Sequence, residues 1–147
     1  MDLSLFADDE TWMIRMDNDG TAYRGFAWAP LGQWTIAHDW DPSPRCGGGL
    51  HGQGEAGNGY AYPGTRFVIC AIKKAEIVVV DDNKIKVPRA RIVAVNEAAW
   101  SLIGPACPVS LDCRDYRFAL PAGLTTVGGA LDCRDYRFAL PAGLTTV

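Results

Sequence analysis

One 17-residue sequence, LDCRDYRFALPAGLTTV, occurs twice in this chain, at residues 111–127 and again at residues 131–147, without a single change. Gly128, Gly129 and Ala130 separate the copies, so the repeat period is 20 residues. Identical copies indicate a tandem duplication, and so short a period predicts units that pack mainly against their neighbours, as in a solenoid. Repeats of this kind usually form recognition surfaces. The duplication therefore favours binding over catalysis, without identifying a partner.

Apolar and charged residues alternate at the start of each unit, where Leu111 and Cys113 flank Asp112. This period of two predicts a strand with leucine and cysteine on one face and the charges on the other. Parallel stacking would bring like residues together, but each aspartate can also meet an arginine of the adjacent unit. We expect the charged face of the repeats to be a contact surface, formed by Asp112, Arg114, Arg117, Asp132, Arg134 and Arg137.

Two units are fewer than the three or so that a freestanding solenoid needs. The tail must therefore lean on the preceding domain, meet a second copy of itself, or continue in a longer parent chain. The second copy ends at Val147 without a cap, and an uncapped apolar end favours self-association. A homodimer formed through the tail is one expectation.

The residues before the repeats are expected to form an independent domain. They number about 105, an ordinary size for one core, and 48% of the whole chain is hydrophobic. We place a mainly β globular domain at residues 1–104, with a glycine-rich loop at 46–60, and the repeat tail at 105–147. The expected fold class is α+β and mainly β. It comprises a mixed or antiparallel sheet, one or two short helices and a short β-solenoid-like tail.

The first domain is expected to contain six or seven strands. Residues 11–16 and 21–28 flank Asp-Asn-Asp-Gly, a strong turn signal, and predict a hairpin. Alternation and β-branched content predict further strands at residues 33–38, 66–72, 76–80, 84–87 and 89–95. Residues 97–103 suit a short helix with Asn96 as its N-cap and Gly104-Pro105 as its stop.

Charge, hydropathy and cysteine content exclude several classes of protein. Lys and Arg number 14 against 17 Asp and Glu, and no basic run exists, which argues against nucleic-acid binding. Apolar stretches such as residues 77–80 are far too short to cross a membrane. The acidic start lacks the features of a signal peptide, so a cytoplasmic location is expected. Five cysteines do not suggest a disulfide framework and are expected to be small buried apolar groups.

The glycine-rich segment is the least ordinary part of the first domain. Seven glycines between Cys46 and Tyr60 indicate unusual backbone angles, close approach of another group, or mobility. Cys46 and His51 could share a zinc ion or act as nucleophile and base. No CxxC-type pair completes a zinc site and no third residue completes a catalytic set, so neither a metal nor a cofactor is expected. The plainer interpretation is a loop whose cysteine packs inward and whose histidine holds it by hydrogen bonds.

Aromatic residues cluster around the proline and glycine loops. Aromatic side chains in loops often anchor interfaces, because they bury much area at little entropic cost. The alternative is that they simply pack the loops. Trp12 and Trp100 are better explained as core residues. The candidate binding residues of this kind are Trp28, Trp34, Trp40, His51, Tyr60 and Tyr62.

Two resemblances can be tied to residues. The unit LPAGLTTVGGALDCRDYRFA resembles the 20-residue bacterial leucine-rich repeats that open with Leu-Pro, here Leu120-Pro121. The asparagine usual after the short strand is absent, which departs from the horseshoe pattern. Over residues 20–97 the chain resembles an uncharacterised family of small bacterial and phage domains. The matching motifs are Arg-Gly-Phe at 24–26, Trp-Asp-Pro at 40–42 and Cys-Gly-Gly-Gly-Leu-His-Gly at 46–52.

A third, weaker likeness concerns ADP-ribosyltransferases, which use an Arg or His to hold a dinucleotide and a Glu to polarise its ribose. Arg24, His51 and Glu97 are the residues that would take these roles. The spacing is compressed for such a fold, and Glu97 also suits the first turn of a helix, where the dipole favours an acid.

These observations lead to one expected function and two alternatives. The expected function is a non-enzymatic protein-binding module of phage or mobile-element origin that inhibits a host defence protein, in the manner of an anti-CRISPR protein. The expected partner is thus a host protein of unknown identity. One alternative is an enzyme, ADP-ribosyltransferase-like or dependent on Cys46 and His51. The other is a structural dimerisation protein.

Overall fold

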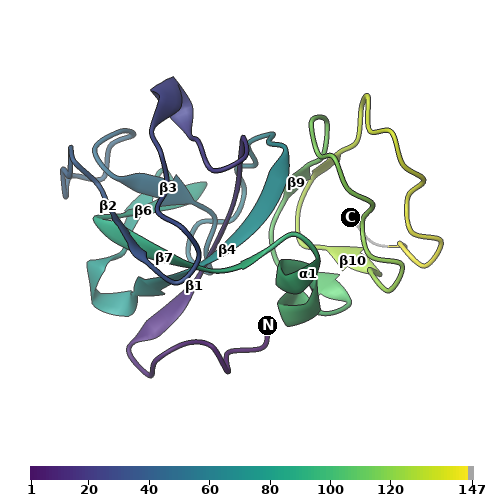
Figure 1. The fold of residues 1–147 in the computed structure, drawn as a ribbon, viewed down its shortest axis with the longest axis horizontal. Helices are drawn as coiled ribbons and strands as arrows, with labels where there is room; N and C mark the ends of the chain where they lie inside the picture. The colour runs from purple at the N-terminus through teal and green to yellow at the C-terminus, as the bar shows by residue number, and fades with distance from the viewer. Residues whose placement is uncertain (146–147) are drawn as a thin grey trace.

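The computed structural model describes residues 1–145 and confirms a mainly β protein, with about 33% strand and 9% helix and its main sheets antiparallel. The larger sheet has the order β1-β4-β7-β2, and the smaller one has the order β3-β6-β5 (Figure 1). The larger sheet comprises β1 (Glu10–Asp17), β4 (Arg66–Lys73), β7 (Arg89–Val95) and β2 (Trp34–Ile36). The smaller comprises β3 (Leu50–Gly52), β6 (Lys84–Val87) and β5 (Val78–Val80).

Strand β4 lies at the centre of the molecule and is buried on both faces. Its run of β-branched residues suits such a position, because both faces of the strand need apolar side chains. Alternation sends Phe67 and Ile69 to one face and Val68, Cys70 and Ile72 to the other. The larger sheet is therefore the middle layer of three.

The smaller sheet and the loops around it cover one face of the larger sheet. Met13 and Val68 of the larger sheet pack there with Ile85 and Val87 of β6. Trp28 and Leu50 belong to the same cluster. The functional site described below lies at the edge of this layer.

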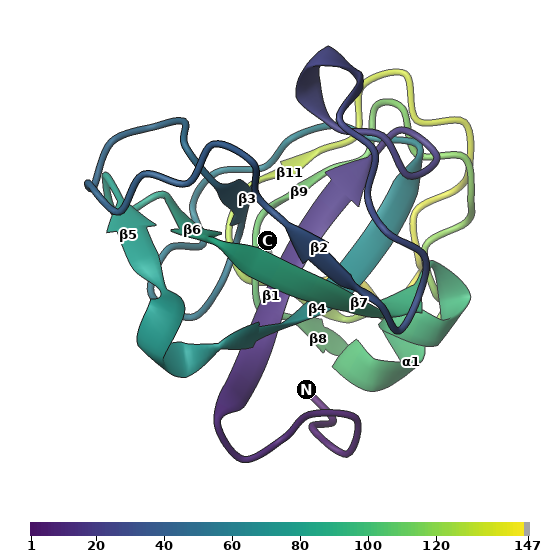
Figure 2. The ribbon, with the colours of Figure 1, turned by 60° about the vertical axis from the view of Figure 1, so that its left-hand side comes forward.

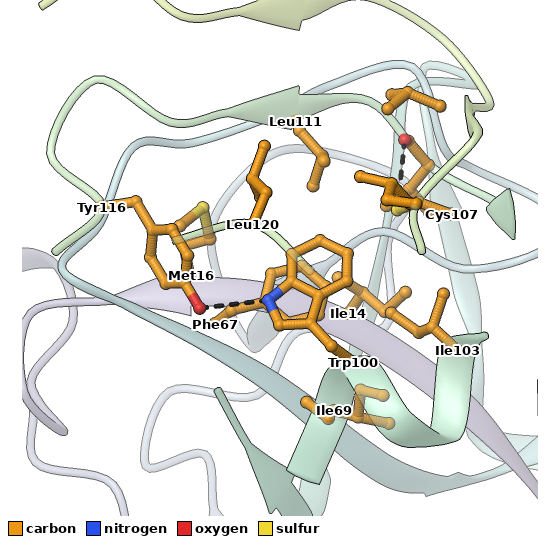
Figure 3. Packing of buried hydrophobic residues seen from close by; sticks show 14 of the residues in the cluster. Ile14, Met16, Phe67, Ile69, Trp100, Ile103, Cys107, Leu111, Tyr116 and Leu120 are labelled. Atoms are coloured by element: carbon orange, nitrogen blue, oxygen red, sulfur yellow. Dashed lines mark hydrogen bonds between the residues drawn. The ribbon is translucent and has the colours of Figure 1, made fainter. Parts of the chain in front are cut away.

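Helix α1 (Glu97–Ile103) and the first repeat unit cover the opposite face of the larger sheet (Figure 3). The indole of Trp100 stacks on Phe67 with ring centroids 4.1 Å apart, and its Nε1 donates a hydrogen bond to Tyr116 Oη at 3.1 Å. Eight residues from the repeat side are buried in this cluster: Cys107, Val109, Leu111, Cys113, Tyr116, Leu120, Leu124 and Val127. One core thus crosses the boundary expected at residue 104, and the tail leans on the preceding domain.

The first repeat unit pairs through short parallel ladders with the segment just before it and with the second unit, each ladder joining residues one repeat period apart. Strand β10 (Thr126–Val127) pairs with β8 (Ala106–Cys107), and β11 (Leu131–Asp132) pairs with β9 (Leu111–Asp112). The green and yellow traces of the two units run beside each other in Figure 2. Each ladder is two residues long, which is too short to define a solenoid.

Side chains add to the contact between the units. Arg114 Nη2 lies 2.7 Å from Asp112 Oδ2, and its Nε lies 3.5 Å from Asp132 Oδ2 of the next unit. Asp132 also accepts from Arg134 at 2.7 Å, and these hydrogen bonds lower the pKa of Asp132 to about 2. Tyr136 Oη accepts from Leu120 N–H at 2.8 Å.

Most of the expected strands are confirmed, but the hairpin over residues 11–28 is wrong. Strand β1 pairs along all eight of its residues with β4, and on its other edge Ile14 exchanges backbone hydrogen bonds with Gln53. Both edges of β1 therefore already have backbone partners. Residues 23–25 form a 3-10 turn instead, visible as the dark blue coil at the top of Figure 1.

The structure also corrects two details of the predicted elements. Helix α1 is confirmed, but the side chain of Asn96 does not cap it: Asn96 has φ 50°, and its Oδ1 accepts the N–H of Phe67 at 2.9 Å. Strand β3 was missed, because it is three residues long and ends in glycine. In residues 1–145 no helix is long and apolar enough to cross a membrane.

Candidate functional site

A cavity of about 890 Å³ opens beside β1 and β3, bounded by the loops at residues 21–26, 37–39, 46–49 and 60–63. Fold contacts bring these segments together from distant parts of the chain. Six residues singled out in the sequence line it: Arg24, Trp28, Cys46, His51, Tyr60 and Tyr62. The sequence offered them as separate candidates, and the structure makes them one site.

The glycine loop forms a fixed wall of this cavity. Lys86 is completely buried, and its ammonium donates to the carbonyl oxygens of Arg45 at 2.8 Å and Gly47 at 3.0 Å. Gly48 has φ 61°, and a Cβ there would lie only 2.6 Å from the Cβ of Asp41. Positive φ and close approach thus explain this glycine, and buried hydrogen bonds hold the loop in place.

His51 is held by the loop rather than poised for proton transfer. Its Nε2 accepts the N–H of Gly47 at 3.2 Å. Burial, reinforced by Lys84, Lys86 and Arg15, lowers the pKa of His51 to about 4. The ring is therefore neutral near pH 7 and a weak base. This agrees with the interpretation of His51 as a residue that ties the loop down.

Cys46 departs from the expectation that it packs inward. Its thiol is exposed at the cavity, where Lys84 Nζ lies 3.2 Å from the sulfur. Cys133 is likewise exposed, whereas Cys70, Cys107 and Cys113 are buried as expected. Two exposed thiols, one at the cavity and one in the second repeat unit, provide a matched pair of chemical probes.

Stability is expected to fall between pH 6.5 and about pH 4 because of His51. Since the folded-state pKa is depressed, the unfolded chain binds a proton in this window that the folded chain does not. The loss should be on the order of 1–3 kcal/mol, below the full value for the shift because His51 is partly exposed. Chemical denaturation at several pH values should show it, and His51→Gln should flatten the slope. An unchanged slope in His51→Gln would contradict the assignment. Protonation of Asp132, whose pKa in the folded protein is about 2, affects stability only at lower pH.

Arg15 is a functional candidate that the sequence interpretation missed. It lies on β1 and lines the cavity, with its guanidinium 4.4 Å from the ring centroid of Trp28. Nη1 donates to the carbonyl of His51 at 2.8 Å, whereas the enclosed Nε has no hydrogen-bond partner in the described part of the chain. Burial lowers the pKa of this arginine, which nonetheless stays charged at neutral pH. A signal existed, because Arg15 is the only charged residue in TWMIRM.

Other predicted site residues lie elsewhere. Glu97 begins α1 and does not line the cavity with Arg24 and His51, so the three ADP-ribosyltransferase-like residues are not brought together. Trp34 sits on β2 among Lys73, Arg89 and Arg91. Trp40 packs against the glycine loop, where a Cβ on Gly49 would lie 3.0 Å from its ring.

The charged residues of the repeats do not line this cavity. Arg114, Arg117 and Arg137 border a second hollow of about 580 Å³ near Asn18 and Thr65, and Arg117 pairs there with Asp19 at 3.1 Å. Within residues 1–145, no three His, Cys, Asp or Glu side chains come close enough to hold a metal ion.

Comparisons of the chain with protein-family models, with curated proteins and with solved structures each find no match.

Proposed function

We propose that the protein is a non-enzymatic binding protein and that the cavity beside β1 and β3 is its binding site. The observation that carries the proposal is the cavity itself. Its volume of about 890 Å³ lies within the range of small-molecule sites, and its walls combine aromatic rings with polar and charged side chains. The buried Lys86 fixes one wall before any ligand arrives, which reduces the ordering cost of binding.

Catalysis has less support from the same residues. The His51 ring is neutral, and its Nε2 is occupied by the backbone of Gly47. The thiol of Cys46 contacts the ammonium of Lys84. Nucleophilic catalysis needs a base within reach of the nucleophile and a third group that orients the base. These contacts supply a recognition surface more readily than such a set.

The repeat tail is proposed to be a short solenoid-like stack that supports the binding domain. Parallel pairing at an offset of one period and the Arg114 contacts across the units favour this arrangement. Several narrower expectations stay predictions: a host defence protein as the partner, a phage or mobile-element origin, a homodimer through the tail, and a cytoplasmic location.

Alkylation of cysteine tests the proposal. The full-length protein is incubated with iodoacetamide in the presence of a cell extract split into small-molecule and macromolecular fractions. Mass spectrometry then follows Cys46 and Cys133 separately. A fraction that contains the natural ligand should slow modification of Cys46 and leave Cys133 unchanged, since only Cys46 lines the cavity.

The two thiols make the outcome specific. Equal slowing at Cys46 and Cys133 would mean consumption of the reagent. If no fraction slows Cys46 relative to Cys133, the cavity is not the binding site and the proposal fails. The fraction that protects Cys46 also tells whether the ligand is a small molecule or a macromolecule.

A further inference from the structure

We infer that the cavity binds a small aromatic oxyanion, a planar ring that carries a carboxylate or a phosphate group. The inference rests on the proposed function, because it names the ligand class of the same site. Its basis is a guanidinium that faces the cavity without an anionic partner.

Arg15 provides this guanidinium. Its one hydrogen bond to a described residue goes from Nη1 to the neutral carbonyl of His51, and no carboxylate of residues 1–145 forms an ion pair with it. Asp17, two residues along, has its side chain fully enclosed and is already held by Arg66, at 2.7 and 3.0 Å. A desolvated charge without a counter-ion is strongly unfavourable, so an anion entering the cavity would be stabilised there.

The same pattern holds for the other cations of the cavity. Arg24 lies 5.3 Å from the ring of Tyr23, and Lys84 lies 5.0 Å from that of Tyr60. Neither forms an ion pair with a described carboxylate. Outside the cavity, by contrast, seven of the chain's Lys and Arg residues have such partners: Arg66, Lys73, Arg89, Arg91, Arg114, Arg117 and Arg134. Within residues 1–145, none of the three cations that line the cavity is thus paired, whereas seven of the eleven outside it are.

The hydrogen-bonding capacity of the guanidinium favours an oxyanion. Charge-assisted bonds from guanidinium N–H groups to carboxylate or phosphate oxygens are about twice as strong as neutral ones. Nη2 has no acceptor among residues 1–145 and, unlike Nε, is not enclosed by its neighbours, so it is the nitrogen open to the cavity.

The aromatic walls select a planar ring. Tyr60 and Tyr62 meet edge to face at 4.7 Å between centroids, and both remain substantially exposed at the mouth of the cavity. Trp28 forms part of the interior wall, and its enclosed Nε1 also lacks a partner. Stacking on aromatic side chains contributes to the binding of planar bases in nucleic-acid sites. An aromatic ring joined to an oxyanion would use both features together.

Titration calorimetry on the full-length protein tests the inference with matched probes. AMP is compared with adenosine, and indole-3-acetate with indole, so that each pair differs by its anionic group. We expect at least one anion to bind about tenfold or more tightly than its neutral partner, the effect of a charged hydrogen bond. Binding of AMP alone identifies phosphate, and binding of indole-3-acetate alone identifies carboxylate. Inorganic phosphate should bind more weakly than AMP.

Variants assign the effect to the cavity. Arg15→Met should weaken binding of the preferred anion about tenfold, and Arg45→Met should not, because Arg45 is exposed and does not line the cavity. If Arg15→Met does not fold, Lys84→Met replaces it and should also weaken binding of the preferred anion. The inference is overturned if neutral probes bind as tightly as the anions or if the folded cavity variants bind like wild type. It is also overturned if no anion binds while an extract still protects Cys46, which leaves the proposed function standing.

Discussion

A chain that ends at Gly104 is expected to lose its cooperative fold, whereas a chain that ends at Gly128 keeps it. The shorter chain lacks the eight buried residues that residues 105–127 add to the core. Each large apolar side chain that loses its burial costs about 1.5–3 kcal/mol. Summed over these side chains, the loss is comparable with the 5–15 kcal/mol by which a domain is typically stable. Near-ultraviolet circular dichroism and chemical denaturation would show the difference.

The longer truncation is the matched control, because it removes only the second unit. It loses the hydrogen bond that Tyr136 Oη accepts from Leu120 N–H and the one that it donates to Phe118. It also loses the backbone bonds from Leu111 to Ala130 and from Cys113 to Asp132. Reduced stability with a single sharp transition is the expected behaviour. If the chain ending at Gly104 unfolds as sharply as the full chain, residues 1–104 fold without the repeats and the shared core is not essential.

Leu124→Ala should destabilise the protein by about 2–5 kcal/mol, whereas the same change at Leu144 should cost less than half as much. The two leucines occupy the same position of identical repeats, so their sequence neighbours are the same. Leu124 is fully buried in the shared core, and Leu144 is only partly buried. Truncation of a buried leucine removes transfer free energy and leaves a cavity, whereas a surface site relaxes. Urea denaturation of both variants gives the comparison.

A second pair tests whether burial alone decides the result. Leu120 is 5% exposed and Leu140 is 43% exposed, again at one repeat position. Leu120→Ala should therefore also cost several times more than Leu140→Ala. Equal effects within either pair would show that the two units contribute alike, contrary to the asymmetric packing of the core.

The strands of the larger sheet could be predicted because the apolar pattern of each sequence matches the burial of its two faces. Residues 66–73 and 89–95 are β-branched or alternate with a period of two, which is what a buried strand and its half-buried neighbour require. The segment at 21–28 has comparable local signals, yet it forms no strand. Its turn is real, since Asn18 and Thr21 pair, but β4 and Gln53 occupy the edges of β1 that the segment needed. Long-range competition of this kind leaves no local trace.

The cavity was predictable in its parts but not as a whole. Glycine content marked the loop around Cys46 and His51, and loop aromatics marked Trp28, Tyr60 and Tyr62. Their convergence depends on the pairing of β3 with β6, and β3 is only three residues long. Arg15 was overlooked because a charged residue within a strand suggests a solvent-facing position. The pleat instead turns it to the face where Met13 is buried.

The duplicated sequence has a consequence for how this chain folds. Two identical segments compete for a single place against Phe67 and Trp100, because either copy carries the side chains that fill it. The first copy begins seven residues after Gly104 and the second 27 residues after it. Closing the longer loop costs only about 1 kcal/mol more. A slipped isomer, with the second copy docked and the first looped out, is therefore expected to compete with the native arrangement early in folding. The contacts between the two units, absent from that isomer, are what make the native arrangement unique.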